Sequence, residues 1–325
     1  IFRVVGHFRR RFPGLVTDWD VVNEPIDNDG TRRSNLWQRW IGDRYIDYAF
    51  RFARRAGGPK VELYLNDYFD DAMMAGSEAI GGEFDDGDPV PMPTPGASWP
   101  LGCEAVVKCA ATRALVLGLR ERRVPIDGVG FQGHMLSAVP SDYRALTRWV
   151  GQLGLQWAIT EADRPIPAGA PGPAREAQAQ AFATALRSCV ADPACDTYVL
   201  WNLADRYTWW RELSSGLLPD ALPWDEELQP KPAVGALGAE LAAARRRPAC
   251  HLRSARIAIP RRFGEVRRAR AIVVGTGLSR AASGRRAELR VPLRGVRGRS
   301  VQIRLTLRLR RESAVKRIAR TVHCQ

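Results

Sequence analysis

Apolar and polar residues follow two different periods along residues 1–248. Short apolar runs that read as buried strands alternate there with longer segments in which apolar residues recur every three to four positions, as on one face of a helix. We expect strands at Val16–Asn23, Lys60–Asn66, Gly128–Gly133, Gln156–Thr160 and Thr197–Trp201. We expect helices near Asn35–Ala56, Glu104–Arg123, Ser141–Leu153, Pro173–Val190 and Lys231–Arg247. Strands that alternate with helices predict five βα units and a parallel sheet.

The period changes to two near the C-terminus. From Val301 to Arg310 every second residue is apolar, which predicts a strand with one buried face and one Arg-rich, solvent-exposed face. Similar short alternations occur at Leu252–Ile259 and Ala287–Leu293. The pattern predicts two domains, an α/β domain over residues 1–248 and a small all-β module over residues 249–325.

Charge supports this boundary. The 325-residue chain has a net charge of +14, but residues 249–325 alone hold 20 Arg and one Lys against three Glu, and all ten Trp and seven Tyr precede them. Such a basic module suits an acidic polysaccharide or cell-wall polymer through long-range attraction. A stabilising module with a solvated charged face explains the charge equally well. The module has only Phe263 as an aromatic platform for bases, so we predict no nucleic-acid partner, and no apolar run is long enough to predict a membrane span.

The six cysteines form three pairs by proximity, namely Cys103 with Cys109, Cys189 with Cys195, and Cys250 with Cys324. An even count in close pairs favours disulfides and a secreted, extracellular protein, although no signal peptide is visible in this chain. Six reduced thiols or a zinc site are the alternatives. No Cys-x2-Cys pair with a His at ligand spacing occurs, so we predict no metal.

Polar residues follow the predicted strands at their C-terminal ends. Asn23-Glu24, Asn66-Asp67 and Glu161 with Asp163 are examples, and a charged group at the end of a buried strand is not explained by core packing. In a (β/α)₈ barrel these strand ends converge on the catalytic site. Two carboxyl groups, Glu24 and Glu161, are what glycoside hydrolysis requires, although a single strand-terminal Glu can equally be part of a structural ion pair.

Five motifs in this sequence resemble those of one known enzyme family. Trp19-Asp20-Val21-Val22-Asn23-Glu24-Pro25 resembles the acid/base strand of glycoside hydrolase family 10, the endo-β-1,4-xylanase family, and Thr160-Glu161-Ala162-Asp163 resembles its nucleophile strand. The other three motifs are Leu65-Asn66-Asp67-Tyr68, Gly130-Phe131-Gln132-Gly133-His134 and the run from Leu200 to Trp209, which is followed by Gln229-Pro230-Lys231-Pro232-Ala233. They occur in the family's order between Val4 and about Leu241.

The resemblance implies a role for each matching residue. Glu24 would be the general acid/base and Glu161 the nucleophile, with His134 and Asp163 supporting Glu161. The residues expected to bind substrate are Asn23, Gln132, His134, Trp201, Trp209, Asn66 and Tyr68. No cofactor or metal is implied. The implied fold is a (β/α)₈ TIM barrel, incomplete because only about the last five βα units have counterparts here.

The implied function is a retaining endo-1,4-β-xylanase that hydrolyses internal β-1,4-xylosidic bonds by double displacement. Its partner would be xylan or a related β-1,4-linked plant polysaccharide. Because the family's first three βα units have no counterpart, we expect the chain to be N-terminally truncated and its own activity to be low. The alternative is a catalytically impaired fragment or degenerate family member that acts as a carbohydrate-binding protein.

Overall fold

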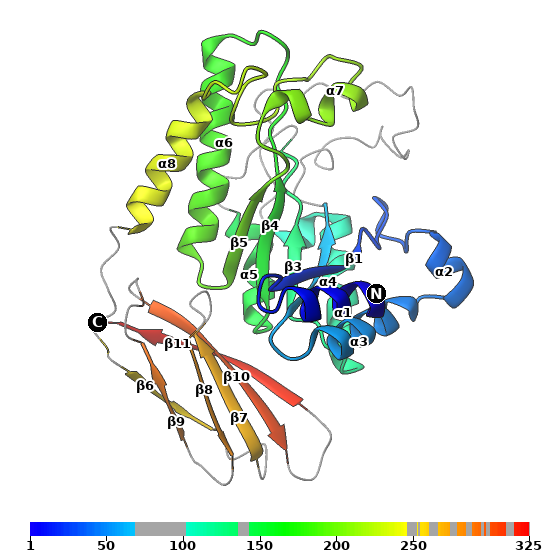
Figure 1. Cartoon of the computed structure of the whole chain (residues 1–325), viewed down its shortest axis with the longest axis vertical. Coiled ribbons are helices and arrows are strands. Elements are labelled where there is room, and N and C mark those ends of the chain that lie inside the picture. The colour runs from blue at the N-terminus through cyan, green and yellow to red at the C-terminus, as the bar shows by residue number, and fades with distance from the viewer. Residues whose placement is uncertain are drawn as a thin grey trace.

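A computed structural model shows a five-stranded parallel sheet flanked by helices, followed by antiparallel sheets (Figure 1). It describes residues 1–68, 102–135 and 143–245. In the C-terminal part it describes residues 252, 254–259, 266–273, 278–283, 288–293, 296, 300–309 and 315–324.

All five predicted strands of the α/β part are present. They are β1 (Asp18–Asn23), β2 (Glu62–Asp67), β3 (Gly128–Phe131), β4 (Gln156–Ala162) and β5 (Cys195–Leu200). They pair in sequence order β1-β2-β3-β4-β5, and every pairing is parallel. The carboxyl ends of neighbouring parallel strands meet at one edge of the sheet, so the polar residues that follow them are brought together there.

The helices differ from the expectation in three places. They are α1 (Phe2–Arg11), α2 (Leu36–Ile41), α3 (Tyr45–Gly57), α4 (Val107–Glu121), α5 (Arg144–Gln152), α6 (Gly172–Ala191), α7 (Trp210–Leu213) and α8 (Pro232–Arg245), with 3₁₀ turns η2 (Cys103–Ala105) and η3 (Asp205–Tyr207). Helices α1 and α7 were not expected, and one expected helix is split. The single helix expected over Asn35–Ala56 is wrong, because the chain turns at Gly42 with φ +76°, a left-handed conformation that ends α2 before α3 begins.

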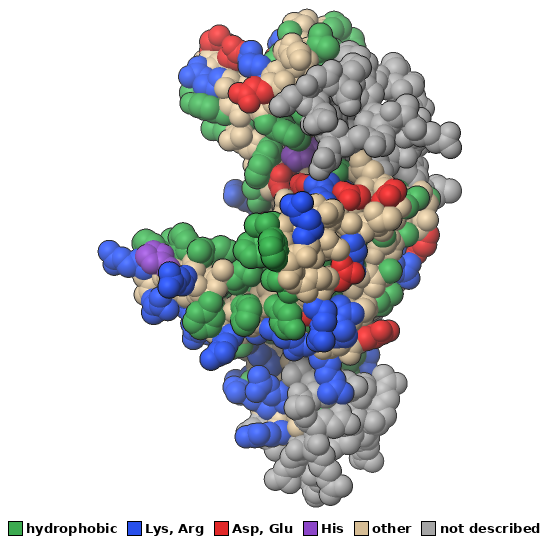
Figure 2. Space-filling view, turned by 90° about the vertical axis from the view of Figure 1, so that its right-hand side faces the viewer, with side chains coloured by type: hydrophobic (Ala, Val, Ile, Leu, Met, Phe, Trp, Pro, Cys, Tyr) green, Lys and Arg blue, Asp and Glu red, His purple; other side chains and the backbone are tan. Residues whose placement is uncertain are grey.

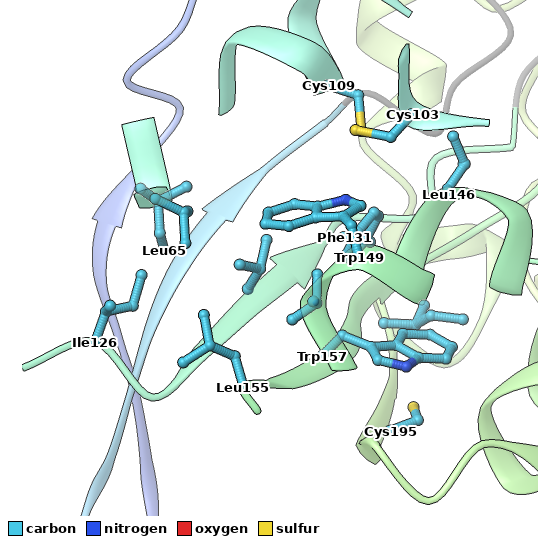
Figure 3. Packing of buried hydrophobic residues seen from close by; sticks show 14 of the residues in the cluster. Leu65, Cys103, Cys109, Ile126, Phe131, Leu146, Trp149, Leu155, Trp157 and Cys195 are labelled. Carbon is cyan, nitrogen blue, oxygen red and sulfur yellow. A yellow bond between two sulfur atoms is a disulfide. The ribbon is translucent and has the colours of Figure 1, made fainter. Parts of the chain in front are cut away.

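The main core lies between the sheet and its helices. Phe131 of β3 meets Trp157 of β4 edge-on with ring centroids 6.1 Å apart, and both side chains are fully buried. Figure 3 shows Leu65, Phe131, Trp149 and Trp157 in the same buried cluster as the Cys103–Cys109 disulfide. This packing of large apolar side chains supplies most of the stability that holds the strand ends in place.

Two of the three expected disulfides are confirmed, Cys103–Cys109 and Cys189–Cys195. Cys324 is also disulfide-bonded. Its expected partner, Cys250, lies outside the described residues, so that pairing stays a prediction.

The C-terminal part is antiparallel β structure, as the alternating pattern predicts. One sheet has the order β11-β10-β7-β8, from β11 (Val315–His323), β10 (Ser300–Leu309), β7 (Val266–Val273) and β8 (Ser279–Ser283). A second pairs β6 (Ser254–Ala258) with β9 (Glu288–Pro292). Ile303, Leu305 and Leu307 of β10 are fully buried in the core of this module. The boundary between residues 248 and 249 stays a prediction.

One arginine links this module to the parallel sheet. Arg304 of β10 is 4% exposed and donates to the carboxylate of Glu62, the first residue of β2, over 3.2 Å. Glu62 lies at the amino-terminal end of the parallel strands, so the module contacts the end of the sheet opposite to Glu24 and Glu161 (Figure 1). No helix in the described part of the chain is long and apolar enough to cross a membrane.

Candidate active site

Strand pairing positions Glu24. Its backbone N–H donates to the carbonyl of Asn66 over 2.9 Å, which carries the β1–β2 register one residue beyond β1. Glu24 has φ +50°, a left-handed conformation that is uncommon for a residue with a side chain. Such local strain concentrates at functional sites, where the surrounding structure holds it in place.

The second carboxylate, Glu161, lies near the end of β4. Its N–H donates to the carbonyl of Gln132 over 2.7 Å. Its carboxylate accepts from the amide of Asn66 over 2.8 Å, and its other oxygen lies 3.2 Å from Nε2 of His134. Side chains from β2 and from the segment that follows β3 therefore contact both oxygens of Glu161.

Asn66 connects the surroundings of the two carboxylates. Besides Glu161, its Nδ2 donates to Oδ1 of Asn23 over 2.9 Å, and its own oxygen accepts from the hydroxyl of Thr160 over 2.7 Å. The space that Asn66 occupies depends on Gly130, where an added Cβ would lie 2.3 Å from the Asn66 oxygen. A residue expected to contact substrate is thus also a hydrogen-bond partner of Glu161.

Gln132 and Asn23 hold the carboxylate of Glu24. The Gln132 amide donates to Oε1 over 2.8 Å, and the Asn23 amide reaches the same oxygen over 3.3 Å. The second oxygen accepts from Nη1 of Arg33 over 2.7 Å. Gln132 also contacts Oδ1 of Asn23 over 3.4 Å, so these side chains form one connected network.

His134 lies between two carboxylates. Its Nδ1 is 3.0 Å from Asp163, which is fully buried, and its Nε2 faces Glu161. The other oxygen of Asp163 accepts from the indole N–H of Trp209 over 3.0 Å. This line of contacts orients the imidazole toward Glu161, as a carboxylate partner does for a functional His.

Two tryptophans flank this line. Trp201 and Trp209 are 41% and 36% exposed, so core packing does not account for them. Their rings lie 6.3 Å and 5.0 Å from the His134 ring, centroid to centroid. An exposed indole face beside carboxylates offers an apolar surface with a polar edge, which suits the faces of sugar rings.

Two residues beside Glu24, Arg33 and Lys108, were not predicted from the sequence, and both contact Tyr68, which was expected to bind substrate. Arg33 donates to the hydroxyl of Tyr68 over 2.7 Å, and the ammonium of Lys108 lies 2.9 Å from the centre of the Tyr68 ring. Lys108 also pairs with Asp67 over 3.0 Å, and both side chains are fully buried. Burial raises the pKa of Asp67 to about 7 despite this pairing, and burial lowers the pKa of Lys108.

In the described residues no group of three or more His, Cys, Asp or Glu side chains is arranged to hold a metal ion. The groups that converge here are amides, an imidazole, a guanidinium and the carboxylates of Glu24, Glu161 and Asp163. This donor set suits acid/base and nucleophilic chemistry on a neutral, hydroxyl-rich substrate.

The sequence profile described as Glycosyl hydrolase family 10 matches residues 1–81 and 103–239. "Endo-1,4-beta-xylanase 2" of Aureobasidium pullulans is 31% identical over 251 residues, which are 73% of this chain and 58% of the relative. "Endo-1,4-beta-xylanase B" of Thermotoga neapolitana is 32% identical over 243 residues, 72% of this chain and 58% of the relative. The chain thus spans less than two thirds of the length of these relatives.

Solved structures show a similar arrangement. Xylanase 10B from Thermotoga petrophila in complex with xylobiose matches with a TM-score of 0.56 and 29% identity, over 74% of this chain and 63% of that structure. The endo-1,4-beta-xylanase XylE of Penicillium canescens matches with a TM-score of 0.59 and 29% identity, over 74% of this chain and 64% of that structure.

Proposed function

The chain belongs to glycosyl hydrolase family 10, and from that premise we propose that it is a retaining endo-1,4-β-xylanase. The substrate would be xylan or a related β-1,4-linked plant polysaccharide. The relatives named above are xylanases, and one solved relative holds xylobiose. The likeness to these structures indicates a (β/α)₈ barrel, of which the parallel sheet of β1 to β5 is part. That the chain holds only about the last five units stays a prediction.

In the first step, Glu161 would attack the anomeric carbon while Glu24 donates its proton to the glycosidic oxygen. The bond between that carbon and the glycosidic oxygen breaks, the shortened chain leaves as an alcohol, and the sugar stays bound to Glu161 as an ester. Asn66 and His134 are placed to orient the attacking carboxylate. Asn23 would bond the sugar 2-hydroxyl, a contact that strengthens in the transition state.

In the second step, Glu24 would take a proton from water as the water oxygen bonds to the anomeric carbon. The ester bond breaks, Glu161 leaves as a carboxylate, and the configuration of the sugar is retained. Trp201 and Trp209 would form the apolar walls of the sugar site. No cofactor or metal takes part in this scheme.

One observation carries the proposal: Glu24 and Glu161 share a single network of amide donors. Asn66 contacts Glu161 directly and reaches the Glu24 side through Asn23, while Gln132 bonds Glu24 by its side chain and Glu161 by its backbone. The alternative, a degenerate member that only binds sugar, gains no support from an intact pair of this kind.

The test compares two substrates. Glu24→Ala should slow xylan hydrolysis by about 10²–10⁴-fold, the usual contribution of general acid/base catalysis. Formation of the ester from dinitrophenyl xylobioside should be slowed far less, because dinitrophenolate leaves without a proton. Glu176→Ala, at an exposed position of α6, is the matched control and should change neither rate. An equal loss of both rates in Glu24→Ala would remove Glu24 from the acid role.

We also propose that the protein is secreted, since its Cys103–Cys109 and Cys189–Cys195 disulfides favour an oxidising compartment. Comparing the amount of protein in the culture medium and in the cells, followed by thiol blocking and intact-mass measurement, tests this. The protein should accumulate in the medium with no blocked thiol at these cysteines, and protein confined to the cells, or thiols that react without prior reduction, would contradict the proposal.

The basic module is proposed to bind an acidic polysaccharide. Arg308 of β10 stands directly opposite Arg268 of β7 in the sheet register, and both side chains are exposed. Like charges directly opposite each other in a sheet repel, and a bound carboxylate would relieve that repulsion. Figure 2 shows several Arg side chains on the surface of the described part of this module.

The double variant Arg268→Gln with Arg308→Gln should weaken salt-sensitive binding to polygalacturonate and leave binding to neutral arabinoxylan unchanged. Arg256→Gln is the control, because Arg256 lies on the other sheet, is highly exposed and already faces Glu288 at 4.0 Å. Equal binding of polygalacturonate by the double variant, or tighter binding of duplex DNA by the unmodified chain, would contradict the proposal.

A further inference from the structure

A turn of chain brings Arg33 back onto Glu24. After Glu24 the chain forms a short antiparallel bridge between Ile26 and Arg32, and the N–H of Arg33 donates to the carbonyl of Pro25 over 3.0 Å. Asp27 closes this turn by accepting from the N–H of Gly30 over 2.9 Å. Backbone hydrogen bonds therefore set the position of Arg33 relative to Glu24.

Each side-chain nitrogen of Arg33 has its own partner. Nη1 donates to Glu24 over 2.7 Å, Nε to Asp27 over 2.9 Å, and Nη2 to the hydroxyl of Tyr68 over 2.7 Å. The side chains of Arg33 and Glu24 are about three quarters buried, at 25% and 27% exposed. A guanidinium bonded at three nitrogens is rigid, and its pairing with a carboxylate is stronger than a neutral hydrogen bond.

The buried ion pair of Lys108 and Asp67 lies behind Tyr68. Lys108 of α4 lies against the ring of Tyr68, and its charge is balanced by Asp67, the last residue of β2. Burial lowers the pKa of the Arg33 guanidinium. The interactions with Tyr68, Glu24 and Asp27 outweigh burial, so the pKa of Arg33 is raised. Arg33 is therefore a permanent cation.

The contacts of Glu24 are those of a carboxylate. Gln132 and Asn23 donate to one oxygen and Arg33 donates to the other. A carboxyl group with donors on both oxygens is acceptor-only, whereas a general acid must present an O–H to the leaving oxygen. The geometry beside Arg33 thus matches the base form of Glu24, which is needed when water attacks.

We propose that Arg33 is a positioning residue for Glu24 that favours its ionised, water-activating form and so serves the second step of the reaction more than the first. The inference rests on the proposed xylanase function. In that second step the water proton passes to the Glu24 carboxylate, the water oxygen bonds to the anomeric carbon, and the bond from that carbon to Glu161 breaks. Tyr68, Lys108 and Asp67 act through Arg33 by holding its guanidinium in place.

Rapid kinetics with dinitrophenyl xylobioside separates the two steps. The burst of dinitrophenolate reports formation of the ester, which needs no proton from Glu24, and the steady rate reports its hydrolysis. Arg33→Gln should leave the burst rate nearly unchanged and slow the steady rate about tenfold. A tenfold change corresponds to about 1.4 kcal/mol of lost transition-state stabilisation.

Two variants make the result specific. Arg33→Lys keeps the charge and should recover part of the steady rate. Arg39→Gln carries the same change at an exposed position of α2 and should match the unmodified chain. Azide, which attacks without a base, should accelerate ester breakdown in Arg33→Gln more than in the unmodified chain.

The inference fails if Arg33→Gln hydrolyses the ester at the unmodified rate, or if burst and steady rates fall together. The latter outcome would mean that Arg33 only maintains the structure. An unmodified chain that binds xylobiose but shows neither burst nor turnover would instead support the carbohydrate-binding alternative, and would overturn the proposed xylanase function and this inference with it.

Discussion

Replacing Arg304 by Met should loosen the contact between the antiparallel module and the parallel sheet. Arg304 is nearly buried, with a side chain 5% exposed, and it donates to Glu62, whose side chain is 23% exposed. Methionine keeps much of the side-chain volume and removes the charge and the donors. The change therefore tests the ion pair rather than the packing.

The expected loss follows from the burial of the two partners. Removing one member of a fully buried ion pair costs roughly 3–5 kcal/mol because the other charge is left unpaired. Glu62 still reaches water, so a value near that of one charged hydrogen bond, about 2 kcal/mol, is expected. If the 325-residue chain unfolds as one cooperative unit, that corresponds to a fall of roughly 3 °C in Tm.

The loss should depend on pH. Burial, and then the neighbouring Asp127, raise the pKa of Glu62, while Arg304 opposes both. Without Arg304 the folded protein binds a proton at Glu62 more readily, so stability is lost as pH rises. Arg304→Met should therefore cost less at pH 5 than at pH 8.

Thermal unfolding of four proteins measures the coupling: the unmodified chain, Arg304→Met, Glu62→Gln and the double variant. The double variant should lose less stability than the sum of the two single losses, because each single change already breaks the same pair. Arg267→Met is the control, since Arg267 lies on the adjacent strand β7 and is exposed. Additive losses, or an Arg304→Met variant that unfolds at the same temperature as Arg267→Met, would refute the contact.

Three further predictions concern the parallel sheet and its site. Gly130→Ala should displace Asn66, because the added Cβ would lie 2.3 Å from the Asn66 oxygen. Such a small displacement in an active site should lower the rate on aryl xylobiosides by about tenfold or more, and an unchanged rate would contradict this. Burial raises the pKa of Asp196 to about 7, so the folded state holds a proton that the unfolded chain releases near pH 4, and stability should fall as pH rises between these values. Asp196→Asn should flatten that decline in Tm, and an identical decline would rule out Asp196 as its cause. A crystal structure should place the carboxyl groups of Glu24 and Glu161 about 5–5.5 Å apart, whereas about 9 Å would indicate an inverting mechanism.

The sequence predicts the strand ends well, because buried parallel strands are short apolar runs that stop at polar residues. The expected contacts of His134 with Glu161 and Asp163 are present. Proximity along the chain was enough to pair Cys103 with Cys109 and Cys189 with Cys195.

What the sequence could not predict depends on how the chain turns back on itself. The break at Gly42 is hidden because the apolar period continues on both sides of it. Arg33 looks like one more surface arginine until the bridge after Glu24 places it on the carboxylate. Lys108 shows no signal either, since a lysine on a helix is usually solvated and its burial depends on Asp67 in a distant strand.

Trapping the covalent intermediate tests the central claim most directly. A 2-deoxy-2-fluoro-xylobioside with a dinitrophenyl leaving group forms the ester and releases it slowly, so peptide mass spectrometry can locate the sugar. We predict one fluoroxylobiosyl group per chain, on the peptide that contains Glu161, and no labelling of Glu161→Ala. A label on Glu24, or hydrolysis of xylan with inverted configuration and no label, would contradict the assignment of the two carboxylates.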